Sequence, residues 1–162
     1  MTPPHVRIVG CGHPDAGDDA AGLILADLLR LRVPPEVEIK TATAGGASLL
    51  ECFEGVEVLI LLDAALATAE FLPGQWRRFA FPADRERLQA TMLRGTHSLG
   101  VVPALELAKT LGRLPREVLL YAVAGARFDL GTPLSPAVQQ SLATVAHELA
   151  TEDWAMGSYL NT

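Results

Sequence analysis

Two adjacent aspartates, Asp18 and Asp19, lie in a glycine-punctuated stretch between an apolar segment and an amphipathic one. Further along the chain, Asp63 directly follows a long apolar run, and His97 precedes a segment with helical periodicity. Carboxylates and an imidazole are ligands for borderline divalent cations such as Zn²⁺, Ni²⁺, Mn²⁺ or Fe²⁺. A set of three leaves coordination positions open for water or substrate. Asp19, Asp63 and His97 are therefore candidate metal ligands if the fold brings them together.

Each of these residues also has a purely structural interpretation. Asp18 or Asp19 could cap the helix that follows, because an aspartate there accepts a backbone amide and complements the helix dipole, and we expect one of the two to do so. Asp63 could stabilise a turn, although a carboxylate ending so apolar a strand needs a cation or a donor to offset its desolvation. His97 could cap its own helix or lie exposed in solvent.

The elements that must position these residues alternate between strand and helix. Apolar and β-branched runs predict strands at 6–9, 37–41, 56–62, 118–123 and, as a candidate edge, 76–81. Helical periodicity and breakers predict helices at 21–29, 47–53, 99–111 and 136–152, whereas 84–94 is expected to be charged and exposed. This order predicts a parallel or mixed sheet between helical layers. Such folds bind ligands beyond the carboxyl ends of their strands.

Size and charge exclude several classes of protein. A chain of 162 residues fits a single domain, 1–162, with a core at about 6–150. A net charge of -6 without a basic cluster disfavours nucleic acid and anionic membranes as partners. The longest uninterrupted apolar run, Val58 to Leu62, is too short to cross a bilayer, and the N-terminus lacks the pattern of a secretory signal, so we expect a cytoplasmic protein. The spacing of Cys11 and Cys52 fits neither a zinc module nor a redox motif, and both are expected to be buried.

Several short motifs occur together in a characteristic order. They are Gly10-x-Gly12, Asp18-Asp19-Ala20-Ala21-Gly22, Leu62-Asp63-Ala64, Pro73-Gly74, His97-Ser98-Leu99-Gly100 and Leu134-Ser135-Pro136-Ala137-Val138. In this combination the chain resembles the nickel-iron hydrogenase maturation endopeptidases, from about Val6 to about Leu149. The resemblance implies an α/β fold, a three-layer α/β/α sandwich with a twisted, mostly parallel five-stranded sheet.

The resemblance also implies an activity and a site. Members of that family remove a C-terminal extension from the hydrogenase large-subunit precursor after nickel has been inserted. By position, Asp19, Asp63 and His97 would be the metal-binding and catalytic residues. The nickel would belong to the substrate, and other divalent cations could replace it in the isolated protein. Since no serine or cysteine has an adjacent histidine, we favour attack by water over an acyl-enzyme route.

The sequence departs from the family pattern in two places. His13 stands where the family usually has asparagine, and Thr41-Ala42-Thr43 stands where it usually has Asp-Gly-Gly. His13 could add a fourth ligand, alter how the large-subunit tail is oriented, or simply lie exposed in a loop. The change at 41–43 raises the alternatives of a distinct hydrogenase partner or of lost cleavage.

Three other functions fit parts of the sequence. A non-catalytic nickel-sensing maturation chaperone would share the fold and the metal site. A nucleotide- or phosphate-binding domain would use the glycine loop, but that loop lacks the GxGxxG spacing and the Walker lysine. A metallohydrolase acting on small molecules would hold its metal tightly. The sequence further predicts that Asp18→Asn is mild if Asp18 only caps a helix.

Overall fold

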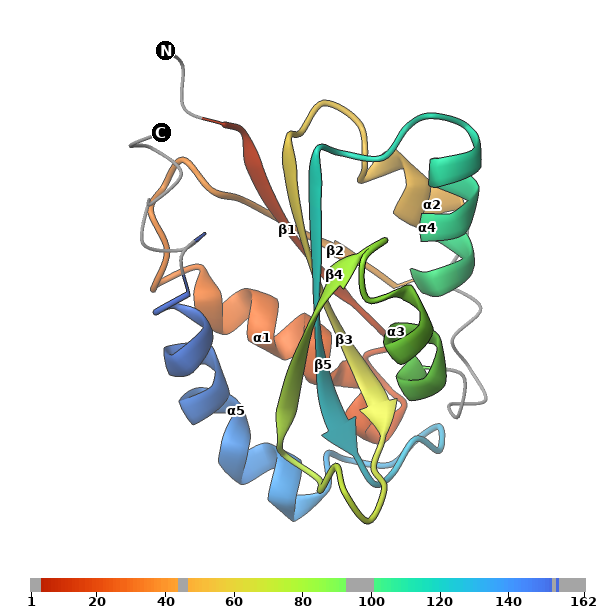
Figure 1. Ribbon diagram of the computed structural model, residues 1–162. Coiled ribbons are helices and arrows are strands. Elements are labelled where there is room, and N and C mark those ends of the chain that lie inside the picture. Colours follow the sequence, from red (N-terminus) through yellow and green to blue (C-terminus); the bar gives the residue numbers. More distant parts are fainter. Residues whose placement is uncertain (1–3, 44–46, 93–100, 153, 155–162) are drawn as a thin grey trace.

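The computed structural model describes residues 4–43, 47–92, 101–152 and 154 (Figure 1). Within them, five strands form one sheet: β1 (Val6–Cys11), β2 (Glu38–Ala42), β3 (Val58–Leu66), β4 (Trp76–Phe81) and β5 (Glu117–Gly125). The strand order is β2-β1-β3-β5-β4, and only β4 runs antiparallel to its neighbour. The predicted mostly parallel five-stranded sheet is confirmed, as is the position of 76–81 at its edge.

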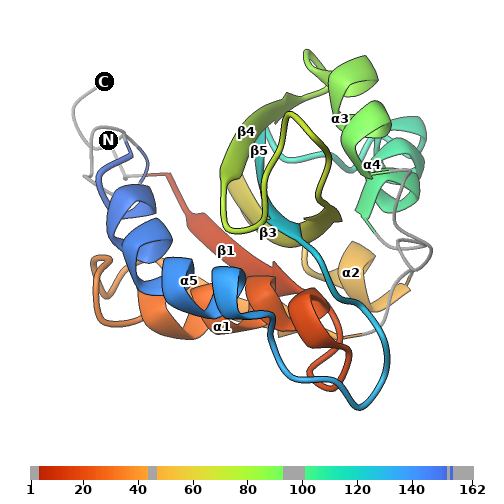
Figure 2. The same cartoon turned by 90° about the horizontal axis from the view of Figure 1, so that it is seen from below.

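Helices cover both faces of the sheet (Figure 2). A 3-10 turn, η1 (Gly17–Ala20), leads into α1 (Ala21–Leu29), which lies with α5 (Pro136–Leu149) on one face. The other face carries α2 (Ala47–Glu51), α3 (Arg85–Met92) and α4 (Val101–Thr110). This arrangement is the expected three-layer α/β/α sandwich. No helix in the described part of the chain is both long and apolar enough to span a membrane.

The central strands are apolar on both faces because each face packs against its own hydrophobic core. In β3, Leu59 and Leu61 point into the core under α2, α3 and α4. The intervening Ile60 and Leu62 point into the core under α1 and α5. A strand buried on both faces has no solvent-facing positions, so period-two polarity disappears.

The helices predicted at 47–53 and 136–152 end earlier, at Glu51 and Leu149, and two other elements differ more from the sequence-based expectations. The stretch expected to be charged and exposed contains α3, whose Leu88 and Met92 lie four residues apart and are both buried. One apolar pair on an otherwise polar helix gives too weak a periodic signal to predict it. The third strand does not end before Asp63 but continues to Leu66, because β5 remains its partner beyond the point where β1 stops.

Candidate active site at the carboxyl edge of the sheet

The order of the strands places a topological switch point between β1 and β3, and we call the region beyond the carboxyl ends of these two strands the crevice. The chain leaves β1 for β2 on one side and then crosses to β3 on the other. The connections that follow β1 and β2 therefore pass over opposite faces of the sheet, α1 on one and α2 on the other. In open α/β sheets, ligands bind at this switch point, beyond the carboxyl ends of the strands. Asp19 follows β1 and Asp63 lies in β3, so both flank the crevice.

Asp19 is held in a half-exposed position in η1. Its Oδ2 atom accepts the backbone N–H of His13 at 2.9 Å, which ties the carboxylate to the loop that leaves β1. Gly12 has φ +143°, and a side chain there would collide with the backbone carbonyl of Asp19. The glycine therefore allows the loop to fold closely over the residue that presents this carboxylate.

Asp63 is a buried carboxyl group beside the crevice. Only 6% of the residue is exposed, and its Oδ1 atom accepts the backbone N–H of Ala64 at 2.8 Å. The pKa of Asp63 is raised to about 8: burial is the largest cause, the hydrogen bond from Ala64 opposes the shift, and the negative charge of Asp19 adds to it. A carboxyl group whose ionisation is opposed by burial and by a neighbouring carboxylate forms a site that a cation would stabilise.

Asp18 does not cap the first helix, and neither does Asp19. The structure shows no side-chain cap on η1 or α1. Asp18 is instead completely buried, and its carboxylate accepts four hydrogen bonds from the loop between β5 and α5. The donors are the backbone N–H groups of Ala126 (2.7 Å), Arg127 (3.0 Å) and Ser135 (2.7 Å), and the Ser135 hydroxyl (2.8 Å). The expectation that one of the two aspartates is a helix cap was wrong.

Backbone hydrogen bonds also join η1 to the loop between β5 and α5, and we call these contacts, together with those of the Asp18 carboxylate, the clasp. The Asp18 N–H donates to the carbonyl of Arg127 at 2.6 Å, and the Gly17 N–H donates to the carbonyl of Thr132 at 3.1 Å. Gly125 makes the approach possible, because a Cβ atom there would lie 2.7 Å from the Cβ of Asp18. Ser135 occupies the N-cap position of α5, but its hydroxyl donates to Asp18 and makes no cap on the helix.

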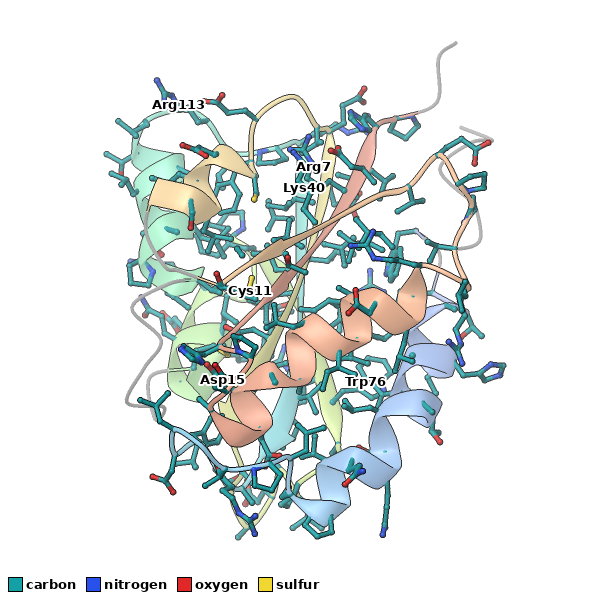
Figure 3. The ribbon with its side chains drawn as sticks, turned by 180° about the vertical axis from the view of Figure 1, so that it is seen from behind. Arg7, Cys11, Asp15, Lys40, Trp76 and Arg113 are labelled. Atoms are coloured by element: carbon teal, nitrogen blue, oxygen red, sulfur yellow. The ribbon has the colours of Figure 1, made fainter. Side chains whose placement is uncertain are left out.

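Cys11 is the last residue of β1 (Figure 3), and His13 follows it two residues later in the chain. His13 is exposed, and its Nδ1 atom accepts the backbone N–H of Asp15 at 3.1 Å, so only Nε2 is left to approach a ligand. Cys11 is buried; burial, followed by the charge of Asp63, raises the pKa of its thiol well above the usual value. Cys11 and Cys52 are both buried free cysteines, as expected.

The departure at 41–43 is only partly a surface feature. Thr41 and Thr43 are exposed, whereas Ala42 is buried and lies in register with Cys11. Ala42 therefore contributes a small, buried side chain next to the end of β1.

His97 lies outside the described residues. Within the described ranges, no three His, Cys, Asp or Glu side chains are close enough together to hold a metal ion. The structure thus brings Asp19 and Asp63 to one crevice, and the three-residue site that includes His97 stays a prediction.

Comparison with known proteins decides the family. The family model described as hydrogenase maturation protease matches residues 25–152, well over half of the chain. The chain belongs to this family. Comparison with curated proteins gives no match.

Solved structures agree with the assignment to the hydrogenase maturation proteases. The hydrogenase maturating endopeptidase HybD of E. coli superposes with a TM-score of 0.77 at 21% identity, covering 94% of each chain. The [NiFe] hydrogenase maturation protease HybD of Thermococcus kodakarensis gives 0.69 at 25% identity, covering 91% of this chain and 99% of its own. The hydrogenase 2 maturation peptidase of a Thaumarchaeota archaeon gives 0.62 at 26% identity, covering 90% and 95%.

Sequence reasoning missed the structural role of Asp18. Its partners lie 108 to 117 residues away, so no local pattern could reveal them. One feature of the sequence pointed to a second role: a helix cap needs only one aspartate, and two adjacent aspartates are present. The structure gives that other task to Asp18 and leaves Asp19 facing the crevice.

Proposed function

We propose that this hydrogenase maturation protease removes the C-terminal extension of a nickel-iron hydrogenase large-subunit precursor after nickel insertion. Asp19, Asp63 and His97 would contact the nickel that the precursor already carries. The metal would then be part of the substrate, and its arrival would signal that the precursor is ready for cleavage.

The observation that carries this proposal is the pair of carboxyl groups in the crevice. Asp19 is half exposed and hydrogen-bonded, while Asp63 is buried and has a pKa of about 8. Near neutral pH, Asp63 mostly keeps its proton in the absence of a cation. A divalent cation beside both groups would favour their ionised forms and release that proton. On this proposal, the pair is fully ionised only when a metal ion is bound.

The environment of Cys11 supports attack by water. A thiol becomes a good nucleophile when its pKa is lowered by nearby positive charge. Cys11 has the opposite setting, because burial and the charge of Asp63 both raise its pKa. We therefore assign the nucleophile to a water molecule that is activated by the precursor's metal or by a crevice carboxylate.

Incubation with nickel-loaded precursor tests the proposal, with mass spectrometry of the large subunit as the readout. We expect loss of a C-terminal peptide with the wild-type protein, and no loss when the precursor lacks nickel. Asp19→Asn, Asp63→Asn and His97→Ala should abolish cleavage, whereas Asp15→Asn, an exposed change in the same loop, should process normally.

Two results would contradict parts of this scheme. Binding of the loaded precursor without any cleavage would favour a nickel-sensing chaperone. Full processing by His97→Ala would remove that residue from the site.

A further inference from the structure

The sheet ends in two edge strands, β2 and β4, whose outer backbone groups differ. In β4, the N–H of Ala80 donates to the Asp84 carboxylate at 2.8 Å, and the Ala80 carbonyl accepts the Asp84 N–H at 2.7 Å. The chain that leads into α3 therefore occupies the outer side of β4 at this residue. Folded proteins commonly block an open edge in this way, because unpaired backbone groups there can pair with another chain.

The outer side of β2 is open. The Gly12 N–H donates to the carbonyl of Ala42 at 3.2 Å, so Ala42 directs its backbone groups toward β1. Successive residues of a strand direct these groups to opposite sides, so Lys40 also faces β1, whereas Ile39 and Thr41 face away from it. Within the described ranges, the N–H and C=O groups of Ile39 and Thr41 have no hydrogen-bond partner in the protein. We call this row of unpaired groups the β2 edge.

Ion pairs fix the start of β2 to the neighbouring strand. The Nη2 atom of Arg7, in β1, lies 2.8 Å from the Glu38 carboxylate. Arg7 is buried and also donates to the carbonyl of Cys52 at 2.8 Å. The Nζ atom of Lys40 lies 3.3 Å from the other oxygen of Glu38, so both cations meet at one carboxylate (Figure 3). The β2 edge is therefore a fixed row of backbone groups on a strand that is anchored to the sheet.

The other end of β2 is joined to the loop that holds Asp19. The Gly12 N–H, which bonds Ala42, directly precedes the His13 N–H, which bonds the Asp19 carboxylate. A strand added at the β2 edge would lie about 10 Å from β1, since neighbouring strands are about 4.8 Å apart. About four extended residues, at about 3.3 Å each, would lead from it to the crevice beyond β1. One peptide chain can therefore occupy the β2 edge and the crevice together.

We propose that the β2 edge binds the C-terminal extension of the precursor as an added strand, through backbone hydrogen bonds to Ile39 and Thr41. This proposal rests on the proposed function. The extension is a single chain end, and each of its peptide units carries the donor and the acceptor that the edge requires. Two residues of open edge offer little area for a second copy of this chain, because stable interfaces bury about 1,200–2,000 Å². Recognition through the backbone leaves the sequence of the extension free to vary.

Thr41→Pro tests the β2 edge, with Thr41→Val as its matched control. Proline removes the outward Thr41 N–H, which has no partner among the described residues, and leaves the groups that pair with β1. Valine keeps this N–H and the branched shape of the side chain. The measurements are the Kd for nickel-loaded precursor, the KM and kcat of processing, and the urea unfolding midpoint.

We expect Thr41→Pro to raise Kd and KM about five-fold or more with kcat preserved, because a backbone hydrogen bond is lost and the proline ring obstructs the added strand. Thr41→Val should leave both constants within about two-fold, as should most surface changes. Both variants should keep the wild-type unfolding midpoint.

Changes in the precursor separate strand pairing from damage to the protease. In two versions of the nickel-loaded precursor, proline replaces every second residue of the extension, in the two alternate frames. One frame removes the N–H groups that would face the β2 edge, and the other removes those that would face solvent. With the wild-type protease, the first should raise Kd about five-fold or more and the second about two-fold or less. Thr41→Pro should not weaken binding of the sensitive version further. Even if Thr41→Pro proved less stable, equal Kd values of the wild type for both frames would overturn the β2 edge.

The outcomes separate this inference from the proposed function. Normal processing by the wild type, with equal Kd and KM for Thr41→Pro and Thr41→Val, would overturn the β2 edge and leave the function standing. A wild-type dimer that Thr41→Pro dissociates in sedimentation would assign the edge to a second copy and overturn this inference as well. Binding that depends on the frame of the prolines, without cleavage by the wild type, would support the edge and overturn the peptidase. No binding of loaded precursor to the wild type would overturn both.

Discussion

Replacing Asp18 with asparagine removes one acceptor from a buried group on which four donors converge. In its better orientation, the asparagine oxygen takes the place of Oδ2 and keeps the N–H groups of Ala126 and Arg127 and the Ser135 hydroxyl. Its NH₂ group then stands where Oδ1 accepted the Ser135 N–H at 2.7 Å, so two donors face each other. The opposite orientation would place the NH₂ against two backbone donors instead of one.

The cost follows from the bond that is lost and the group that is left without a partner. A hydrogen bond to a charged group contributes about 1.5–3 kcal/mol, and a buried unsatisfied donor costs about 1–3 kcal/mol. The remaining bonds also weaken when the acceptor becomes neutral. We therefore expect Asp18→Asn to lower the free energy of unfolding by about 3–5 kcal/mol, a large part of the ~5–15 kcal/mol typical of a domain.

Urea unfolding provides the measurement, with Asp15→Asn as the control in the same loop. Asp15 is exposed, and its backbone carbonyl, which the substitution keeps, accepts the Gly131 N–H. The control should change the free energy of unfolding by about 0.5 kcal/mol or less. A loss below about 1 kcal/mol for Asp18→Asn would refute the clasp and restore the view that this residue is a minor cap.

Three further predictions concern the carboxyl groups of Asp63, Asp19 and Asp18. The pKa of Asp63 is about 8 in the folded protein and 3.8 for an ordinary aspartate, so the folded state keeps a proton that the unfolded state loses. The free energy of unfolding should therefore fall by about 1.4 kcal/mol per pH unit as pH rises between these values. In urea titrations, Asp63→Asn should remove this contribution, and an unchanged pH slope would contradict the prediction. Asp19→Asn keeps an oxygen that can accept the His13 N–H but removes a negative charge. The pKa of Asp63 should therefore fall, which a carboxyl ¹³C NMR titration would measure. An unchanged pKa would show that the two groups are too far apart to interact. Ser135→Ala deletes one of four donors to Asp18 and should cost about 1–2 kcal/mol in urea unfolding; a loss larger than that of Asp18→Asn would show that the hydroxyl acts elsewhere.

The layers and most elements were predictable because their signals are local. The run at 58–62 is apolar at every position, which is typical of a strand covered on both faces. The stretch 76–81 was predicted as a candidate edge strand, and β4 lies last in the strand order, next to β5. Ser135 and Pro136 together marked the start of α5 correctly. In each case, a few neighbouring residues contained the decisive information.

The errors have a different origin. The end of β3 depends on β5, which begins more than fifty residues later and pairs with Leu66 through Gly125. The role of Asp18 depends on a loop more than one hundred residues away. A local interpretation assigned one of the two aspartates to the nearest helix terminus, because proximity in sequence was the only geometry available. Buried polar contacts between distant segments are the features that one sequence alone could not provide.

Asp18 and Asp19 can take different tasks because they lie in a 3-10 turn. Successive residues of such a turn point about 120° apart, so one aspartate can face the interior while the next faces the crevice. The buried carboxylate holds the β5–α5 loop. On the proposed function, the carboxylate that would contact the metal therefore stands next to the carboxylate that fixes its turn to this loop.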